Sequence, residues 1–394
     1  MLMVAGPVLG SEEKSALASV VDSGWITMGE RVREFEREFA RAHGVKDAVA
    51  VSSCTSGLHL VLLALGIGPG DEVLVPSMTF VATVNCIVHV RAKPVFVDIE
   101  ALDRPVMSRD DAARKCTDRT RAVILVHYAG YVLDRDDWRE FARSRGLRLI
   151  EDAAHAAGAT GAGPFGDAAA FSFYGNKNMT TGEGGMVVAE QPDVLDRIRT
   201  MRSHGMTAGT FQRTMARNSG YDVTAIGFNC RMDEFRAAVG LVQLQRLGDW
   251  NRTREQLTRL YVERLDPEIL IPFTQDLARN APSAYHIMPI VLPEGVDRRQ
   301  VVDHLRALEI QTTMHYPPVH SLSVYRNLFK GVTLPVTEEF AGRELTVPLH
   351  PGMEPDDVQL VASALDGALS RTGKRPGSPA RATMQSDPVL VSSV

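Results

Sequence analysis

The sequence predicts an α/β fold, with a mainly parallel sheet covered by helices on both faces and a smaller α/β lobe after it. Through the first 190 residues, short apolar segments alternate with helical segments of about a dozen residues, a pattern typical of parallel sheets. From Asp193 the pattern becomes helical and irregular, and a region with short strands and helices of its own follows. The chain has 394 residues, which is enough for a large core and more than one lobe.

Each element is expected from its own local pattern. Residues 11–24 have helical spacing of apolar side chains after a serine cap signal, and 33–44 form a clearer helix that stops at Gly44. The apolar runs expected as strands are 47–53, 71–77, 93–99, 121–128, 147–153, 168–174 and 186–190. The helices expected between them are 55–66, 79–90, 110–117 and 136–146.

The later part of the chain is expected to form a second, smaller domain. We expect helices at 231–247, 251–265, 298–309 and 355–369, with short strands at 284–292 and 310–316. The predicted division is 1–248 for the large domain with its N-terminal segment, and 249–370 for the small domain. Residues 371–394 are rich in Pro, Gly, Ser and Arg without periodicity, so they are predicted to be a disordered tail.

The composition limits the possible functions. The net charge of -5 gives no overall attraction for nucleic acid or anionic membrane, so an anionic substrate requires a local basic cluster. The cysteines Cys54, Cys86, Cys116 and Cys230 are far apart and without CxxC spacing, which argues against disulfides and a metal site. No signal peptide and no apolar run of roughly 20 residues is visible, so we expect a soluble, cytoplasmic protein.

The stretch Leu147–Glu190 carries the strongest chemical signal. Asp152 ends one apolar run, and Lys177 follows the next, among small, polar and glycine residues. A lysine can hold pyridoxal phosphate as a Schiff base, while a carboxylate keeps the pyridine nitrogen protonated so that the ring acts as an electron sink. Alternatives stay open: Asp152 could cap a helix at 153–158, His155 could lie on that helix's surface, and Lys177 could be a solvated charge.

Two other segments could complete such a site. At Val51–Leu60 a strand gives way to a helix, so free N–H groups and the hydroxyls of Thr55 and Ser56 could bind a phosphate, although an ordinary helix cap explains them too. Phe80 begins a helix directly after a strand, where its ring could stack on a cofactor, although a core position is the more common role.

One apparent nucleotide motif is rejected. Gly161, Gly163 and Gly166 spell GxGxxG, but the dinucleotide fingerprint requires a strand before it and a helix after it. Here the motif contains Pro164 and precedes a strand-like run. We therefore expect no dinucleotide site at these glycines.

These segments together resemble the sugar aminotransferases of the DegT/DnrJ/EryC1/StrS group. The similarity runs from about Gly10 to about Leu369 and includes SSCTSGLHL, PSMTFVAT, EDAAHAAGA and GDAAAFSFYGNKNMTTGEGGMVV. It continues through RSHGM, GFNCRMDEFRAAVGLVQL, SAYHIMPI, HYPPVH and LTVPLHPGM. The resemblance implies the fold type I of aspartate aminotransferase, with a mostly parallel seven-stranded sheet in the large domain.

The resemblance also implies roles for individual residues. Lys177 matches the lysine that forms the internal aldimine with pyridoxal 5'-phosphate and moves the proton between substrate and cofactor carbons, with pyridoxamine phosphate as intermediate. Asp152 matches the partner of the pyridine nitrogen, Phe80 the stacking aromatic, and His155, where Gln is common, a contact to the ring oxygen. The implied phosphate contacts are Thr55, Ser56, Ser172 and Asn229. Asn229 would come from the neighbouring subunit of a homodimer with shared active sites.

The reaction implied by the resemblance moves an amino group from L-glutamate to a nucleotide-linked keto sugar. TTGEGG after the lysine favours C4 of a 4-keto-6-deoxy sugar; C3 amination of a 3-keto sugar and amination of a keto-inositol (a cyclitol) stay open. A pyridoxal phosphate-dependent sugar 3-dehydratase is disfavoured because relatives of that type carry His in place of the lysine, whereas Lys177 is intact. A catalytically inactive, cofactor-binding regulator is disfavoured because the lysine is intact and no nucleic-acid-binding module is recognisable. The candidate substrate contacts are Arg202, His204, Arg231, His315, Tyr316 and Arg326. The resemblance implies a role in amino sugar biosynthesis, for an antibiotic or for a surface glycan.

Overall fold

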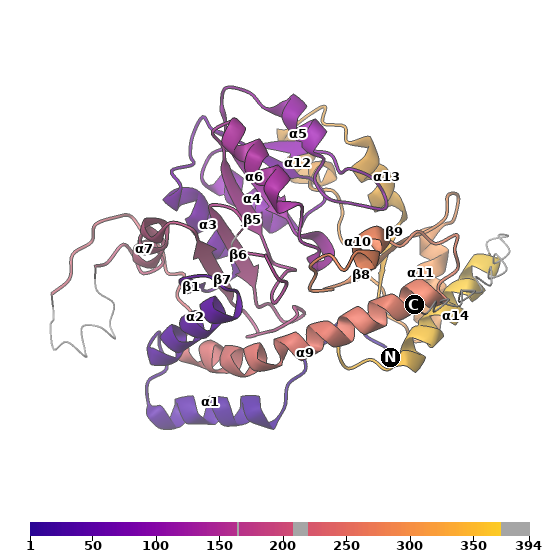
Figure 1. The fold of residues 1–394 in the computed structure, drawn as a ribbon, viewed down its shortest axis with the longest axis horizontal. Coiled ribbons are helices and arrows are strands. Elements are labelled where there is room, and N and C mark those ends of the chain that lie inside the picture. Colours follow the sequence, from indigo (N-terminus) through magenta and orange to yellow (C-terminus); the bar gives the residue numbers. More distant parts are fainter. Residues whose placement is uncertain (164, 208–219, 372–394) are drawn as a thin grey trace, which may run out of the picture.

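The computed structural model describes residues 1–163, 165–207 and 220–371 of the chain, and Figure 1 shows their arrangement. The tail expected at 371–394 lies outside these ranges beyond Arg371. Within them, no helix has the length and apolar character needed to cross a bilayer. The expected cytoplasmic location stays a prediction.

A seven-stranded sheet forms the centre of the molecule. Its strand order is β1-β7-β6-β5-β4-β2-β3, and all neighbours are parallel except that β7 runs antiparallel to both β1 and β6. The strands are β1 (Ala48–Val51), β2 (Glu72–Pro76), β3 (Lys93–Val97), β4 (Thr120–Val126), β5 (Arg148–Asp152), β6 (Ala168–Ser172) and β7 (Gly185–Ala189). The predicted mostly parallel, seven-stranded sheet is thus confirmed.

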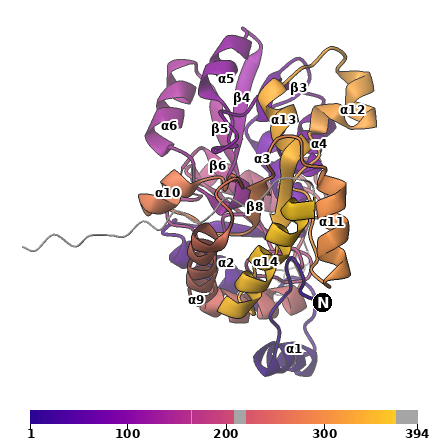
Figure 2. The same ribbon diagram turned by 90° about the vertical axis from the view of Figure 1, so that its right-hand side faces the viewer.

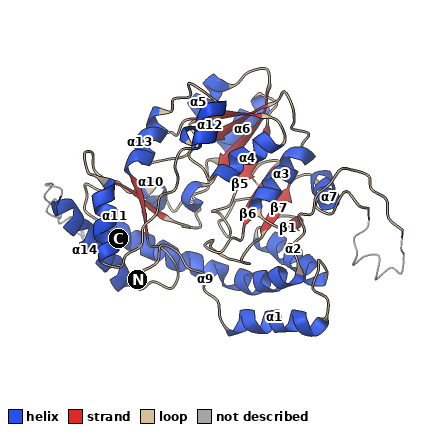
Figure 3. Ribbon diagram, turned by 180° about the vertical axis from the view of Figure 1, so that it is seen from behind, coloured by secondary structure: helices blue, strands red, loops and turns tan. Residues whose placement is uncertain are grey.

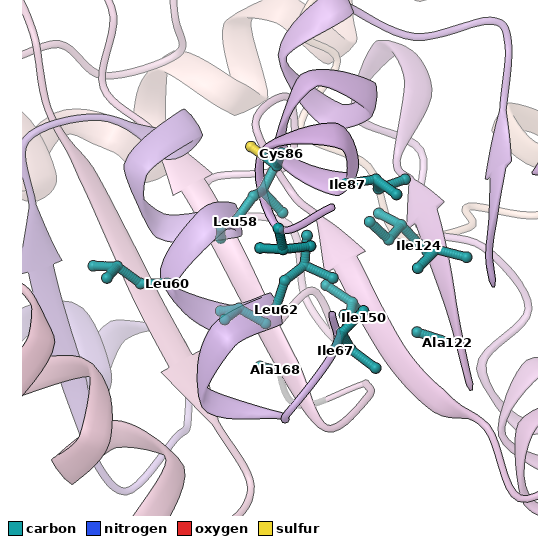
Figure 4. Packing of buried hydrophobic residues seen from close by; sticks show 14 of the residues in the cluster. Leu58, Leu60, Leu62, Ile67, Cys86, Ile87, Ala122, Ile124, Ile150 and Ala168 are labelled. Carbon is teal, nitrogen blue, oxygen red and sulfur yellow. The ribbon is translucent and has the colours of Figure 1, made fainter. Parts of the chain in front are cut away.

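Helices cover both faces of this sheet because its strands are apolar on both sides. In β4, Ile124 points into a core shared with α3, α4 and α7, whereas its neighbour Leu125 points into a core shared with α5 and α6. Figure 4 shows Leu62 of α3 gathered with Ile150 of β5 on the first face. The helices are α3 (Cys54–Ala64), α4 (Val81–His89), α5 (Arg109–Lys115), α6 (Arg135–Ser144) and α7 (Pro192–Met201).

The N-terminal helices pack at the end of the sheet where β1 lies. Phe35 and Phe39 of α2 are fully buried against Ala50 and Phe171 of the sheet, which explains the strong apolar period of this helix. The helix α1 runs alongside α9 (Figures 1 and 3). Their bounds are α1 (Ser11–Ser23), α2 (Glu30–Ala42) and α9 (Glu234–Arg264).

The C-terminal region has a separate apolar core. Leu257 and Tyr261 of α9 pack there with Ile290 of β8 and Leu365 of α14. Figure 2 shows α11 and α14 beside β8 on this side of the molecule. The other elements of this core are β8 (Met288–Val291), α11 (Arg298–Ala307), β9 (Glu344–Val347) and α14 (Pro355–Arg371). The helices α10 (Thr274–Ala278), α12 (Ser323–Leu328) and α13 (Pro335–Arg343) follow α9 in the chain but pack in the cores of the seven-stranded sheet, as do the single turns at Tyr128–Gly130 and Val319–Ser321.

Two expectations for the second half of the chain are wrong. The helices expected at 231–247 and 251–265 are one 31-residue helix, α9. The strand expected at 310–316 forms only isolated bridges, Leu2 with Ile310 and Thr313 with Thr346, because β8 pairs with β9 instead. The predicted domain boundary at 248 falls inside α9, and the division into domains stays a prediction.

Candidate active site

A cavity of about 740 Å³ lies at the carboxyl edge of the sheet. Strands β4, β5 and β6 are parallel, so Val126, Asp152 and Ser172 at their ends face the same opening. The first turns of α3 and α4 and the segment 313–317 complete its walls. The predicted site residues that line the cavity are Thr55, Phe80, Asp152, His155, Ser172, Lys177, His315 and Tyr316.

Asp152 is a buried acid at the end of β5, with 6% of its surface exposed. Burial raises the pKa of its carboxyl, while hydrogen bonds donated by Thr83 Oγ1 (2.7 Å to Oδ2) and Ala154 N (3.1 Å to Oδ1) act in the opposite direction. No basic group of the described residues lies within ion-pair distance of it. Residues 153–163 form turns and bends, so the helix-cap alternative is wrong.

Lys177 lies in a turn after β6, where its N–H donates to the carbonyl of Tyr174 at 3.0 Å. Its side chain is partly buried and reaches the cavity. Burial lowers the pKa of the amine to about 8, and the negative charge of Asp152 opposes that effect. The amine therefore becomes neutral far more easily than that of a solvated lysine, so the surface-charge alternative does not describe it.

The start of α3 has the geometry of an anion site. Ser53 caps the helix by accepting from Ser56 N at 3.1 Å, and Ser56 Oγ lies 3.0 Å from both Ser52 Oγ and Ser53 Oγ. Ser53, Cys54 and Thr55 line the cavity, whereas Ser56 is turned toward the other serines and does not. The Ser53 cap occupies only one of the first N–H groups of α3. The ordinary helix cap is therefore present, and the other N–H groups at this helix end are still free to bind an anion.

Gly185, at the start of β7, permits a close approach between β7 and the first turn of α3. A Cβ atom on Gly185 would lie 2.6 Å from Cys54 N and 2.6 Å from the carbonyl carbon of Ser53. Only a residue without a side chain lets β7 pass the first turn of α3 at this distance.

Aromatic and imidazole rings form the opposite wall. Phe80 is 57% exposed, with its ring centroid 5.9 Å from that of Tyr316, so the core alternative for Phe80 is wrong. Tyr316 Oη lies 2.7 Å from His155 Nε2. His155 is only 5% exposed, which excludes the surface-helix alternative, and its Nδ1 is buried without a hydrogen-bond partner among the described residues.

Other predicted contacts lie away from the cavity. Arg202 is buried in an ion pair with Glu36 at 2.5 Å, which engages its guanidinium inside the protein. Asn229 is exposed, and its segment is held to the end of β1 because Ser52 N donates to Cys230 O at 2.9 Å. The remaining candidates outside the cavity lining are His204 and Arg326, both exposed, and Arg231, partly buried.

Two residues near the cavity were not predicted from the sequence. Thr83, in the first turn of α4, holds Asp152, and His286 Nε2 lies 3.5 Å from Lys177 Nζ. His286 belongs to the segment SAYHIMPI, which contributed to the resemblance but has no local pattern that indicates a site. Only the fold brings it to a lysine 109 residues away.

The rejected GxGxxG segment binds an internal carboxylate. The N–H groups of Gly163 and Gly166 donate to Glu151 at 2.9 Å each, and that of Phe165 donates at 3.1 Å. His127 Nε2 adds a fourth contact to Glu151 at 2.8 Å. These N–H groups are therefore occupied by the fully buried side chain next to Asp152, which agrees with the rejection of a dinucleotide site.

The residues around the cavity fit pyridoxal phosphate. Asp152 is a buried acid without a basic partner, and His155 Nδ1 is a buried nitrogen without one, within the described residues. The N-terminus of α3 offers N–H groups to a phosphate, and Phe80 offers an exposed ring face. An α/β scaffold that turns an easily neutralised lysine toward such an acid is typical of the aminotransferase class of enzymes.

Comparison with known proteins makes the assignment specific. The chain belongs to the DegT/DnrJ/EryC1/StrS aminotransferase family, whose family model matches residues 7–366. It is therefore an aminotransferase of a pyridoxal phosphate-dependent family, and similar solved structures include both pyridoxal phosphate and pyridoxamine phosphate forms.

Individual relatives match over nearly their whole length. The spore coat polysaccharide biosynthesis protein SpsC of Bacillus subtilis (strain 168) is 38% identical over 91% of this chain and 95% of that protein. The aminotransferase TlmJ from Streptoalloteichus hindustanus is 33% identical, with a TM-score of 0.88 over 95% of this chain and 100% of its own. DesI, solved in the presence of its TDP-sugar product, is 32% identical, with a TM-score of 0.82 over 94% of this chain and 95% of its own.

Proposed function

We propose that this sugar aminotransferase moves an amino group from L-glutamate to C4 of a nucleotide-linked 4-keto-6-deoxy sugar. The observation that carries the proposal is the partly buried Lys177 amine, with a pKa of about 8, in the same cavity as the buried carboxylate of Asp152. Pyridoxal phosphate, when bound, supplies an electron sink for charge that develops on the substrate carbon.

The residues of the chain would bind the cofactor and handle the proton. Asp152 would face the ring nitrogen, Phe80 would cover one face of the ring, and His155 would contact its polar edge. Lys177 would accept a proton from the substrate carbon and transfer it to the cofactor carbon, which requires an amine pKa near the working pH. The phosphate would be held by Thr55 and Ser172, and by Ser56 once its hydroxyl turns from Ser52 and Ser53 toward the cavity.

We include a homodimer with shared active sites in this proposal. Asn229 is exposed in the single chain and does not line its cavity, which fits a contact made across a subunit boundary. It would reach the phosphate in the neighbouring subunit. Light scattering of the purified protein tests the dimer, and Asn229→Ala should weaken cofactor binding without disrupting the fold.

The nucleotide-linked substrate is supported by the relatives. DesI was solved in the presence of its TDP-sugar product, and SpsC is named for spore coat polysaccharide biosynthesis. The C4 position rests on the resemblance of TTGEGG. A diphosphate would be met by His315, which lines the cavity, with Tyr316 near the sugar. His204 and Arg231 lie away from the cavity of the single chain and would contribute to a diphosphate site only across the proposed subunit boundary.

One observation favours a cyclitol as the alternative substrate. Among the described residues, the cavity lining contains no arginine, and Lys177 is its one amine. A keto-inositol carries no diphosphate and would need no further cation. A 3-keto sugar nucleotide is the other acceptor to be compared.

The test is a set of single-turnover reactions with the pyridoxamine phosphate form. The acceptors are dTDP-, UDP- and GDP-4-keto-6-deoxyhexoses, a nucleotide-linked 3-keto sugar and a keto-inositol, with the aminated product measured by mass spectrometry. We expect a 4-amino sugar nucleotide, and amination of the inositol alone would overturn the proposal. L-Glutamate should regenerate the amino form with release of 2-oxoglutarate.

The role of Lys177 has its own test. Borohydride reduction of the loaded enzyme followed by peptide mapping should attach the cofactor to Lys177. Lys177→Ala should lose the label and at least about 1,000-fold in turnover. Normal turnover of a keto sugar by that variant would refute the assignment.

A further inference from the structure

The side chain of His286 lies next to the Lys177 amine, and the proposed cofactor site assigns it no role. In the described part of the chain, His286 Nε2, at 3.5 Å, is the hydrogen-bond partner recorded for Lys177 Nζ, and no carboxylate lies within ion-pair distance of the amine. His286 is fully enclosed, with 3% of its surface exposed. The direction of the proton in this contact depends on which ring nitrogen of His286 carries a hydrogen.

Two asparagines behind His286 determine that tautomer. Asn251 Nδ2 donates to the carbonyl of Ala157 at 3.0 Å, so Asn251 Oδ1 is left to accept from Asn178 Nδ2 at 2.7 Å. Asn178 Nδ2 also donates to the carbonyl of Ala284 at 2.6 Å. Backbone carbonyls only accept hydrogen bonds, so both amide groups have one possible orientation.

The orientation of Asn178 fixes the proton on His286. Asn178 Oδ1 faces His286 Nδ1 at 2.7 Å, and an amide oxygen can only accept, so Nδ1 must carry a hydrogen. In a neutral imidazole the other nitrogen is then bare, and here it is the one that faces Lys177.

The surroundings of His286 keep its ring neutral. Its ring centroid lies 4.3 Å from that of His155, and the groups whose charge acts on it are His155, Lys177, Arg254 and His315. Burial, followed by the electrostatic influence of these neighbours, of which Lys177 and Arg254 are the cations near neutral pH, holds the pKa of His286 well below its usual range. An imidazolium would also place an N–H against the amine of Lys177.

We propose that His286 is a fixed hydrogen-bond acceptor for the Lys177 amine, with Asn178 and Asn251 as the positioning residues that hold its tautomer. Such an acceptor stabilises the ammonium form of Lys177 and orients Nζ. It therefore opposes the desolvation of Lys177 and keeps the amine basic enough to take a proton near neutral pH. Without it, the same burial would leave a weaker base.

This inference rests on the proposed role of Lys177 but not on the identity of the sugar. Its first test is the nitrogen NMR spectrum of the cofactor-free, full-length protein labelled with [15N]histidine, assigned with His286→Phe. At about pH 7 we expect Nδ1 of His286 to be protonated and Nε2 to be bare. A protonated Nε2 would overturn the inference.

The second test measures the amine of Lys177 directly. The pH dependence of its modification by an amine reagent in the cofactor-free protein, followed by mass spectrometry, should have a midpoint of about 8. His286→Phe should lower that midpoint by about 1 pH unit because the ammonium loses its acceptor. Asn178→Leu should lower it too, since the ring is then free to present an N–H.

Two matched variants separate this role from a structural one. In His286→Gln, the amide nitrogen can donate to Asn178 Oδ1 while the oxygen accepts from Lys177, so the midpoint should return toward that of the natural protein. His89→Phe, on the exposed end of α4, makes the same chemical change elsewhere and should leave the midpoint in place. A residue with only a packing role would lower stability without moving the midpoint. An unchanged midpoint in His286→Phe would refute the inference even if sugar amination is confirmed.

Discussion

Replacing Glu151 with glutamine should loosen the loop behind the cavity. The carboxylate accepts from Gly163 N and His127 on one oxygen, and from Phe165 N and Gly166 N on the other. In Glu151→Gln one of these positions becomes an NH₂ group, and either orientation of the amide leaves at least one buried N–H without an acceptor. That loss costs about 2 kcal/mol, and the weakening of the remaining bonds by removal of the charge adds about 1 kcal/mol.

The effect can be measured by hydrogen exchange. A local cost of about 3 kcal/mol corresponds to roughly 100-fold faster exchange of the Phe165 and Gly166 amides, if they exchange through local opening. Glu140→Gln, which changes an exposed glutamate on α6, is the matched control and should leave these amides unchanged. Acceleration of less than about fivefold in Glu151→Gln would refute the view that this carboxylate holds the loop.

Three further predictions concern the cavity. Thr83→Val removes the hydroxyl that holds the carboxylate of Asp152, so the pKa of Asp152 should rise further and the affinity for pyridoxal phosphate, measured by titration of the cofactor-free protein, should fall about tenfold. Unchanged affinity would contradict that role. Gly185→Ala places a Cβ against Cys54 N, so it should lower the melting temperature and weaken inorganic phosphate binding together; a loss of stability alone would argue against a phosphate site. The pKa of Lys177 is lowered to about 8, and only the neutral amine reacts, so the rate of pyridoxal phosphate uptake should rise with pH up to about 8 and level off above it. A rate still rising steeply well above that pH would show an ordinary lysine.

The sequence was sufficient to predict the parts of the site that depend on local order along the chain. Asp152 and Lys177 follow consecutive strand-like runs, and parallel strands bring their carboxyl ends to one edge, so their proximity could be inferred. The start of α3 was predictable for the same reason, since a strand followed by a helix exposes free N–H groups wherever it occurs.

The remaining contacts depend on tertiary structure. His286 reaches Lys177 only because the segment before β8 is held by backbone hydrogen bonds to the turn at Tyr128–Gly130, and no local pattern distinguishes it from a buried core histidine. The apolar segment 310–316 resembled a strand, but β8 takes β9 as its partner and leaves one bridge for Thr313. Pairing choices of this kind are decided by packing between distant segments rather than by propensity.

The helix prediction failed at Gly248 for a related reason. A glycine inside a helix costs about 1 kcal/mol relative to alanine, so Gly248 by itself disfavours one helix across the expected segments 231–247 and 251–265. The burial of Leu247 and Asn251 on either side outweighs that cost, and the helix continues.

The continuity of α9 restricts how the molecule can move. A helix of 31 residues is about 46 Å long, and its two ends belong to different apolar cores, one at Ala237 and one at Tyr261. A rotation of the cores relative to each other cannot take place at residue 248 without breaking backbone hydrogen bonds. Any such hinge must therefore lie in the connecting loops, while α9 stays one continuous helix. Asn251 lies near the middle of α9 and accepts a hydrogen bond from Asn178, so a shift of the helix along its axis would disturb Asn178.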